Sequence, residues 1–352
     1  MENTNRVINE SVSIRSAVKM LDTESLDTLI VLGSDKVVLG VFTMGDFRRS
    51  VLTGIDINNN IKTLIHEKYI YLIEGFVRED ITSIFNENPM IQGVPVVNKK
   101  HHLVKYIERG SYAEVSNVAL LDKGVDVVIM AGGKGTRLDP FTRILPKPLI
   151  PIGNNPIVKV IMDEFSAQGV NRFFLSVNEK SRMIKAYFYD HNLSYKLKYI
   201  EEDRPLGTAG SLSYFSGTIK NNLIVSNCDI LVKTCYVSMM NFHKDRDYDI
   251  TIVSSIRHYK IPYGVCILDN SGEFETIQEK PENTYLVNTG MYILKSTVLD
   301  LIPKNQYFDM TDLILAAKSK GLKVGTYPIS EESWLDVGQW KEYKDTVKMF
   351  TE

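Results

Sequence analysis

The stretch Asp126-Val-Val-Ile-Met-Ala-Gly-Gly-Lys-Gly-Thr-Arg-Leu138 decides the fold class of the longer, C-terminal part of this chain. Residues 127–131 form an unbroken apolar run, which is typical of a strand buried on both faces of a parallel sheet. The glycines that follow would let backbone N–H groups approach a phosphate closely. Leu138 stands where the dinucleotide-binding fingerprint has its third glycine, and no GxxxxGK[ST] segment occurs. A tight turn would explain the glycines equally well without the surrounding basic residues, Lys134, Arg137 and Lys147.

Strands and helices alternate downstream of this loop. Asn155-Pro156 places a preferred N-cap residue before a proline at the first helical position, and Gly169 is a typical helix end. Such alternation predicts an α/β domain with a mostly parallel sheet and a ligand site at the carboxyl ends of its strands. The expected strands are 172–177, 197–200, 223–227, 250–255, 263–268 and 287–294, and the expected helices are 155–169, 183–189 and 309–321.

Composition limits the possible functions. The chain has 352 residues, which favours two domains, and 41 Lys plus Arg against 43 Asp plus Glu give a net charge of -2. That balance argues against a nucleic-acid-binding protein. No apolar run could span a bilayer, and the first residues show no signal peptide, so we expect a cytoplasmic protein with no membrane partner. The three cysteines form no CxxC pair.

The N-terminal part contains an internal repeat. Residues 94–107 align without gaps onto residues 29–42, and both segments show a short apolar strand, a polar turn and a second apolar strand. A helical pattern precedes each copy. We therefore predict two domains, at residues 1–120 and 121–352, of which the first is a pseudo-symmetric α/β module.

The C-terminal domain resembles the sugar-1-phosphate nucleotidyltransferases, and the resemblance covers residue 126 to the end. It implies a Rossmann-like fold with a mixed sheet. The motifs that carry it, in the family's order, are Gly132-Gly-Lys-Gly-Thr-Arg-Leu138, Pro146-Lys-Pro-Leu149, Pro205-Leu-Gly-Thr-Ala-Gly210, Asn227-Cys-Asp229, Tyr263-Gly-Val265, Glu279-Lys-Pro281, Asn288-Thr-Gly290 and Trp334-Leu-Asp-Val-Gly338. One departure is Asn227-Cys228, because the family more often has glycine before this aspartate.

The resemblance implies a role for each matching residue. Catalytic roles fall to Arg137, Lys147, Asp229 and Lys280. Nucleotide-binding roles fall to Ala131, Gly132, Gly133, Gly135, Thr136, Leu206, Gly207 and Thr208. Sugar-phosphate-binding roles fall to Gly264, Glu279, Lys280 and Asn288.

Two carboxylates suggest a magnesium site. Asp229 ends a predicted apolar strand, and Asp336 lies in an aromatic-flanked motif late in the chain. Two carboxylates completed by phosphate oxygens are how Mg²⁺ is usually held, although an arbitrary aspartate is more often a helix cap or a surface residue. The D-x-D segments within Asp245–Asp249 lie in a polar run and favour a solvated turn instead. Cys228 is interpreted as a small buried residue rather than a nucleophile.

The N-terminal repeat resembles a tandem pair of CBS domains. Its first copy contains Gly40-Val-Phe-Thr-Met-Gly-Asp46, which matches the adenosine-ligand motif G-h-x-T-x-x-D. By this resemblance Thr43 would bind a phosphate and Asp46 the ribose of an adenine or guanine nucleotide. The second copy has Lys105, Glu108 and Ser111 at the equivalent positions and has lost the motif. A packing or dimerisation module without a ligand is an equally good interpretation.

The expected activity is transfer of a nucleotidyl group from a nucleoside triphosphate to a sugar 1-phosphate, with Mg²⁺ as cofactor, by a homo-oligomer. Within the family the chain resembles CBS-linked guanylyltransferases that make GDP-glucosamine for legionaminic acid, so GTP and glucosamine 1-phosphate are the first expectation. Guanylyl-, thymidylyl- or cytidylyltransferases acting on mannose, heptose or glucose phosphates are alternatives. A non-catalytic nucleotide sensor is a further alternative, but a sensor does not need the whole set of reacting residues.

Overall fold

The computed structural model describes residues 4–24, 26–65, 68–88, 91–109, 120–122, 124–133, 135–178, 180–269, 271–338 and 343. Lys134 of the glycine-rich loop and Ser111 of the second repeat lie outside these residues. None of the described helices has the length and apolar character needed to cross a membrane.

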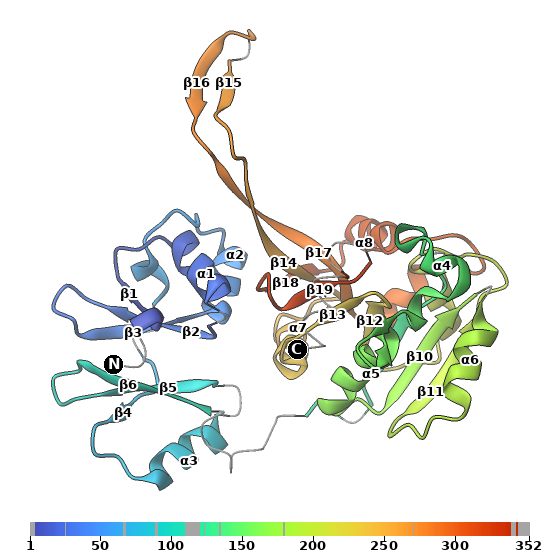
Figure 1. The fold of residues 1–352 in the computed structure, drawn as a ribbon, viewed down its shortest axis with the longest axis horizontal. Coiled ribbons are helices and arrows are strands. Elements are labelled where there is room, and N and C mark those ends of the chain that lie inside the picture. Colours follow the sequence, from blue (N-terminus) through green and yellow to red (C-terminus); the bar gives the residue numbers. More distant parts are fainter. Residues whose placement is uncertain are drawn as a thin grey trace.

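A seven-stranded sheet forms the centre of the C-terminal half, in the order β11-β10-β7-β12-β17-β14-β18 (Figure 1). All neighbours pair in parallel except β17, which is antiparallel to both β12 and β14. The predicted mixed, mostly parallel sheet is therefore confirmed. The strands are β7 (Asp126–Met130), β10 (Arg172–Val177), β11 (Lys196–Glu201), β12 (Leu223–Asn227), β14 (Ile250–Lys260), β17 (Glu282–Leu294) and β18 (Val324–Ile329).

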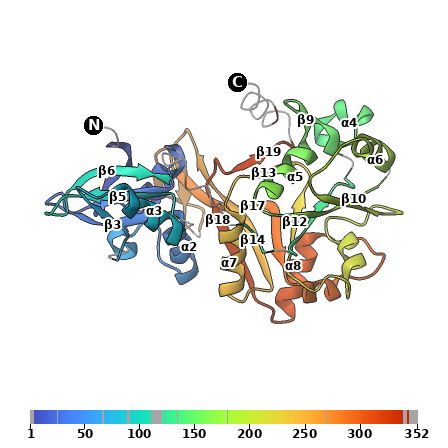
Figure 2. The ribbon, with the colours of Figure 1, turned by 90° about the horizontal axis from the view of Figure 1, so that it is seen from below.

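Helices cover both faces of this sheet (Figures 1 and 2). Alternate residues of β7 point to opposite sides, because Val127 belongs to the hydrophobic core under α5, α6 and α7, whereas Val128 belongs to the core under α8. The remaining elements of this half are α4 (Phe141–Ile144), β8 (Pro151–Ile152), β9 (Asn155–Pro156), α5 (Ile157–Ala167), α6 (Ser181–Tyr189), β13 (Ile230–Val232), α7 (Tyr236–Asp245), α8 (Met310–Ser319) and β19 (Trp334–Asp336).

The predicted start of one helix is wrong. Asn155 does not cap α5, because Asn155 pairs with Ile152 in the short β8–β9 hairpin, and the N-cap is Pro156. Backbone pairing with a neighbouring segment thus overrides the local capping preference. The predicted cap of α8 is confirmed, since Asp309 and Asp312 form a capping box there.

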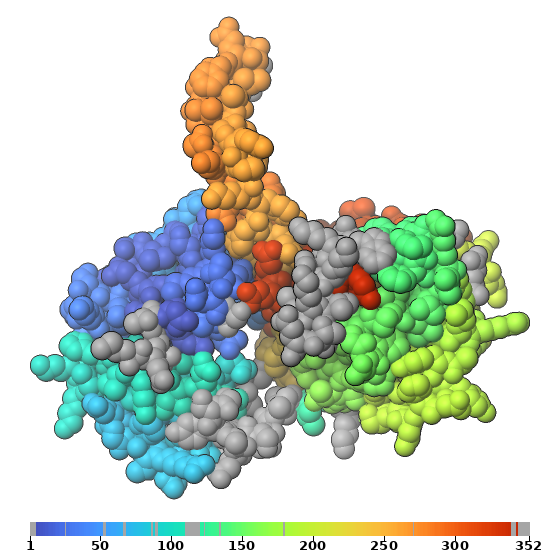
Figure 3. Space-filling model, viewed as in Figure 1, coloured from blue at the N-terminus to red at the C-terminus, as the bar shows by residue number. Residues whose placement is uncertain are grey.

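Strands β14 and β17 extend beyond the sheet as a long two-stranded arm, which continues into β15 (Val265–Leu268) and β16 (Phe274–Gln278) (Figures 1 and 3). Both strands are longer than predicted. The arm is rich in exposed apolar side chains, including Tyr259, Tyr263 and Phe274.

The N-terminal half contains the predicted repeat. Each copy has a helix followed by an antiparallel hairpin, and each hairpin belongs to a three-stranded sheet. The first copy comprises β1 (Val7–Asn9), α1 (Ile14–Thr23), β2 (Thr28–Leu32), β3 (Val38–Thr43) and α2 (Met44–Thr53), and the second comprises β4 (Leu72–Ile73), α3 (Arg78–Glu87), β5 (Gly93–Val97) and β6 (Leu103–Glu108). The duplicated strand–turn–strand prediction is confirmed.

The first copy packs against the C-terminal half next to β18 and the base of the arm (Figure 2). Arg15 of α1 donates hydrogen bonds to the Thr284 hydroxyl, at 3.1 Å, and to the Glu282 carbonyl. Arg48 of α2 donates from Nε to the Pro328 carbonyl at 2.7 Å, and its guanidinium lies 3.8 Å from the Tyr327 ring centroid. This cation–π contact joins the two halves through side chains far apart in sequence.

His243 of α7 makes stability depend on pH. The residue is wholly buried with Nδ1 2.8 Å from the Thr251 hydroxyl, and burial lowers its pKa to about 4. The unfolded chain takes up this proton near pH 6.5, so stability is lost as pH falls from 6.5 towards 4. Going from pH 7 to pH 5 should lower the free energy of unfolding by on the order of 2 kcal/mol.

We expect His243→Gln to reduce the drop in melting temperature between pH 7 and pH 5. His191 is exposed, so His191→Gln should show the same drop as wild type. Equal drops in wild type and both variants would contradict the prediction.

Candidate active site

A cavity of about 420 Å³ opens at the carboxyl ends of β7 and β12, where the sheet predicts a ligand site. Its walls bring together most of the residues predicted for nucleotide binding and catalysis: Gly132, Gly133, Gly135, Thr136, Arg137, Lys147, Leu206, Gly207, Thr208 and Asp229. Ala131 lines an adjoining cavity of about 250 Å³ that shares Gly132, Gly133 and Lys147. Residues from distant parts of the sequence thus meet at one edge of the sheet.

The glycine-rich loop positions Lys147 through close contact. Gly135 has a φ of 67°, and a Cβ there would lie 2.8 Å from Thr142 Cγ2 and 3.0 Å from Lys147 Cβ. The Thr142 hydroxyl also donates to the Gly135 carbonyl at 3.0 Å. Only glycine fits this position without moving the lysine.

We therefore expect Gly135→Ala to lower, at least about tenfold, the rate of a reaction that depends on Lys147, because the added methyl group would displace that lysine. Gly217→Ala is the matched control, since Gly217 has a φ of 74° but nothing within 4 Å of its Cβ position. Both variants introduce backbone strain at a positive φ, but only Gly135→Ala would also displace Lys147. Steady-state rates and melting temperatures of the two variants therefore distinguish the two effects. Equal losses of activity in the two variants would count against a positioning role for Gly135.

A buried ion pair lines the cavity. Lys147 Nζ donates to Asp229 Oδ2, and the two side chains are only 10% and 9% exposed. Lys147 follows Pro146 at the start of a short 3-10 turn, and Asp229 follows the buried strand β12. A buried charge is tolerated when it is paired, and this pair places a lysine and a carboxylate side by side at the cavity wall.

Asp336 lies close to Asp229, although it is not among the residues that line the described cavity. Strand β19 pairs with β13 so that Asp336 lies opposite Ile230, and the Val337 amide donates to the Asp229 carbonyl at 2.9 Å. A Cβ on Gly338 would lie 2.9 Å from Asp336 Oδ1 and closer still to Asp229 Oδ2. Burial, and then the nearby Asp229 charge, raise the pKa of Asp336. Two carboxylates that converge on one small space fit a divalent cation, which would relieve their repulsion.

The sequence model of the Nucleotidyl transferase family matches residues 126–352. The chain belongs to this family. The nucleotidyl transferase domain is therefore the part of the chain that holds the cavity, the ion pair and the two carboxylates.

Curated nucleotidyl transferases align with this domain. The UTP–glucose-1-phosphate uridylyltransferase of Synechocystis sp. is 27% identical over 241 residues, covering 63% of this chain and 62% of that protein. The mannose-1-phosphate guanylyltransferase of Mycobacterium tuberculosis is 27% identical over 224 residues, covering 62% of each. The chain thus spans about 62% of the length of these relatives.

A solved structure, HddC from Yersinia pseudotuberculosis, superposes with a TM-score of 0.52 at 26% identity, covering 64% of this chain and all of that one. The same protein in complex with GMP-PN gives a TM-score of 0.51 at 25% identity. These two superpositions thus cover about two thirds of this chain and the whole of HddC.

The residues predicted to bind the sugar phosphate do not line the described cavity. Gly264, Glu279 and Lys280 lie exposed on the arm, where the Lys280 ammonium is 3.9 Å from its neighbour Glu279. Asn288 lies in β17 beside a shift in the β14–β17 register and donates to the Tyr292 hydroxyl at 2.8 Å. Their roles stay predictions.

Three acidic or aromatic residues of the cavity were missed by the sequence analysis. Glu202 follows β11 and is 8% exposed, accepting from the Ser176 hydroxyl and from the Leu206 amide. Tyr307 and Asp309 come from the segment before α8. A carboxylate directly after a predicted strand was the available signal for Glu202. Asp309 was assigned only to capping, but it also accepts from the Thr208 amide at 2.9 Å and thereby fixes the loop around Gly207.

Cys228 borders the cavity but is unsuited to nucleophilic attack. Its side chain is buried, and burial raises the pKa of its thiol to about 12. A thiol attacks as thiolate, which is negligible at neutral pH with such a pKa. The interpretation of Cys228 as a small buried residue is confirmed.

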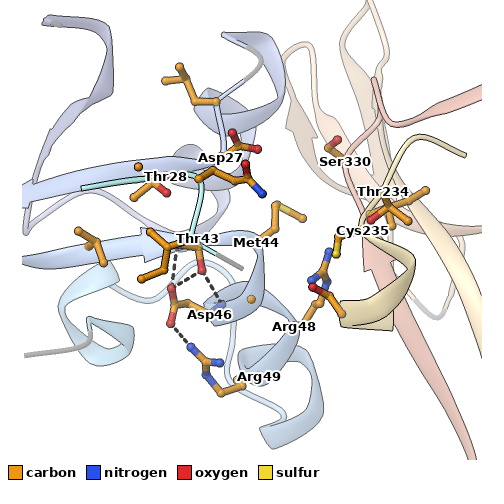
Figure 4. Close-up of a pocket in the computed structure, with 18 of the residues that line it drawn as sticks. Asp27, Thr28, Thr43, Met44, Asp46, Arg48, Arg49, Thr234, Cys235 and Ser330 are labelled. Atoms are coloured by element: carbon orange, nitrogen blue, oxygen red, sulfur yellow. Dashed lines mark hydrogen bonds and ion pairs between the residues drawn. The ribbon is translucent and has the colours of Figure 1, made fainter. Parts of the chain in front are cut away.

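The predicted CBS ligand residues lie at a separate cavity, between the N-terminal and C-terminal parts of the chain (Figure 4). Thr43 is the N-cap of α2, and Asp46 completes a capping box by accepting from the Thr43 amide at 2.7 Å. Asp46 also pairs with Arg49. In the second copy Glu108, at the position of Thr43, pairs with Arg6 instead.

Proposed function

We propose that this chain catalyses Mg²⁺-dependent transfer of a nucleotidyl group from a nucleoside triphosphate to a sugar 1-phosphate. The observation that carries the proposal is the buried Lys147–Asp229 pair, which has Asp336 beside it and lines the same cavity as the glycine-rich loop. Cations next to backbone N–H groups suit a triphosphate, and converging carboxylates suit the metal that accompanies it.

In this reaction an oxygen of the sugar 1-phosphate attacks the α-phosphorus of the nucleoside triphosphate. The bond from the α-phosphorus to the bridging oxygen of the leaving pyrophosphate breaks, and pyrophosphate takes the electron pair. The attacking oxygen is already anionic, so no general base is needed. When bound between Asp229 and Asp336, Mg²⁺ would supply charge neutralisation. Lys147 and Arg137 stabilise phosphate charge, while the glycine-rich loop orients the triphosphate.

The first choice of substrates is GTP with glucosamine 1-phosphate. Guanylyltransferases among the aligned relatives and the GMP-PN complex of HddC support a guanine nucleotide. The uridylyltransferase from Synechocystis keeps UTP and glucose 1-phosphate as an alternative pair. The choice of glucosamine rests on the sequence resemblance alone.

A pyrophosphate-release screen of GTP, UTP, dTTP, CTP and ATP against glucosamine, mannose, glucose and heptose 1-phosphates tests the proposal. We expect one pair to exceed the others, with release abolished by a chelator. Absence of release from every pair would overturn the transferase proposal. Release from UTP and glucose 1-phosphate alone would overturn only the substrate assignment.

The N-terminal residues 1–120 form, in this proposal, a CBS pair with one nucleotide site at Thr43 and Asp46. The duplicated helix–hairpin units and the cavity at the first copy support it. Since Asp46 and Arg49 already pair there, a ribose on Asp46 would displace the guanidinium towards the ligand's phosphates.

A further inference from the structure

The base of the arm is a ribbon of only two strands (Figure 1). Strand β14 pairs with β18 as far as Ser255, and β17 pairs with β12 only from Met291 onwards. From there to the last pair, Lys260 opposite Glu282, the two strands pair only with each other among the described residues. Residues 256–260 thus extend for roughly 16 Å. An isolated two-stranded hairpin is at best marginally stable in water, so the direction of this ribbon depends on what packs against it.

Helix α1 of the N-terminal module, the part of the chain that contains the repeat, packs against one face of the ribbon. Arg15, Lys19 and Asp22 are spaced by four and three residues, so they lie on one face of the helix. Their partners share one face of the ribbon, because two alternate along β17 and the third lies opposite one of them on β14. These partners are His258, Glu282 and Thr284.

The ribbon is held near both of its ends. Lys19 Nζ donates to both carboxylate oxygens of Glu282, at 2.8 and 2.9 Å. This hydrogen bond lowers the pKa of Glu282, which keeps the carboxylate charged at neutral pH. At the end nearer the sheet, Ile256 is wholly buried and belongs to the hydrophobic core of the first repeat.

A chain of polar contacts joins the remaining residues of the two faces. Arg15 donates to the Thr284 hydroxyl, and that hydroxyl can give its own proton to His258 Nδ1, 3.1 Å away. The ring proton of a neutral His258 then lies on Nε2, which is 3.5 Å from Asp22 Oδ2. Burial lowers the pKa of His258 and favours this neutral form. Both strands of the ribbon are therefore tied to α1.

The residues predicted to bind the sugar phosphate lie directly beyond this contact. Lys280 is two residues before Glu282, at the point where the β14–β17 pairing ends. A Cβ on Gly264 would lie 3.0 Å from Glu279 Oε2, so these two predicted residues adjoin each other. Because this segment continues the ribbon, the direction of the ribbon sets where the segment lies.

We propose that Arg15, Lys19 and Asp22 are positioning residues for the sugar 1-phosphate. By holding the ribbon, they fix where Glu279 and Lys280 lie relative to the nucleotidyl transferase domain. The N-terminal module thus supports the transfer reaction through a permanent contact that requires no ligand of its own. This role rests on the proposed function, because it takes the sugar phosphate to bind at the start of the outer part of the arm.

Charge reversal at the last pair of the ribbon tests this role. In Glu282→Lys two ammonium groups face each other, so attraction becomes repulsion. We expect the KM for the sugar 1-phosphate to rise at least about fivefold, with the KM for the nucleoside triphosphate within about twofold of wild type. Combining Lys19→Glu with Glu282→Lys restores an ion pair of opposite polarity, so both constants should return to within about twofold of wild type.

Asp122→Lys is the matched control, since it reverses a charge in the exposed pair with Lys244 and involves neither α1 nor the arm. Its kinetics should match wild type. Lys280→Ala should raise the same KM as Glu282→Lys does. A rise in Lys280→Ala alone, equal rises for both substrates in Glu282→Lys, or no rescue in the charge-swapped protein would overturn the positioning role. Unchanged kinetics in both variants would overturn it as well, because the sugar phosphate would then bind elsewhere.

Amide hydrogen exchange measures the hold on the arm without any substrate. Exchange of 258–260 and 282–284 should be faster in Glu282→Lys than in wild type and normal in the charge-swapped protein, while 250–253 should stay protected in all three. Unchanged exchange of the ribbon in Glu282→Lys would overturn the proposal. Failure of the substrate screen would overturn the proposed function, and this measurement would still decide whether α1 holds the arm.

Discussion

Asp229→Asn should lower kcat by at least about 1000-fold without unfolding the protein. The amide keeps the shape of the carboxylate but removes the negative charge that faces Lys147 and shares its space with Asp336. A site that has lost one of two metal-binding charges loses electrostatic stabilisation of the phosphates, which is commonly worth several kcal/mol. The measurement is single-turnover pyrophosphate release, with a melting curve for each protein.

Asp245→Asn is the matched control for this substitution. Asp245 is exposed at the end of α7 and belongs to the D-x-D segment interpreted as a turn. Wild-type rates are expected for this control. A near-normal rate in Asp229→Asn, or an equal loss in Asp245→Asn, would contradict the assignment of the metal site.

Lys147→Met should lower kcat/KM for the nucleoside triphosphate by about 100- to 1000-fold. Methionine fills similar space, so the loss reports the missing charge rather than a cavity. Lys147→Arg should not restore activity. Gly135 packs closely against the aliphatic part of Lys147, and a guanidinium is broader than an ammonium.

Lys185→Met controls for the loss of a lysine in a surface ion pair, since Lys185 pairs with the largely exposed Glu201. Its kinetics should match wild type. A Lys147→Met enzyme within about threefold of wild type would show that the buried pair is structural and that Arg137 alone carries the charge role.

Local sequence patterns correctly predicted those helices and strands that are determined by neighbouring residues in the sequence. The apolar run into Gly132 predicted β7 and its loop, the aligned hairpins predicted both repeats, and Asp309 predicted the start of α8. The predicted helix cap at Asn155 is wrong because Asn155 pairs with Ile152 in a hairpin, and this pairing depends on residues outside the capping motif.

Features that depend on distant residues could not be predicted from patterns. Nothing in β17 alone indicates that it runs antiparallel between β12 and β14. The closeness of Asp336 to Asp229 follows from the β13–β19 pairing, although the family motifs pointed to both residues. The same motifs grouped Lys280 with the site, whereas the arm places it among exposed residues. Motif order in a chain does not fix where the strands of a long hairpin lie.

The contact of Arg48 with Tyr327 limits how freely evolution could exchange the N-terminal module. A foreign module that covered the same surface without a donor would leave the Pro328 carbonyl buried and without the bond that Arg48 now donates, beside a tyrosine that is 1% exposed. An unpaired buried carbonyl costs roughly 1–3 kcal/mol, a large share of the stability of a typical domain. A replacement module would therefore need a hydrogen-bond donor at the place that Arg48 occupies. The two parts of the chain are separate in sequence, but this contact makes their exchange depend on one side chain.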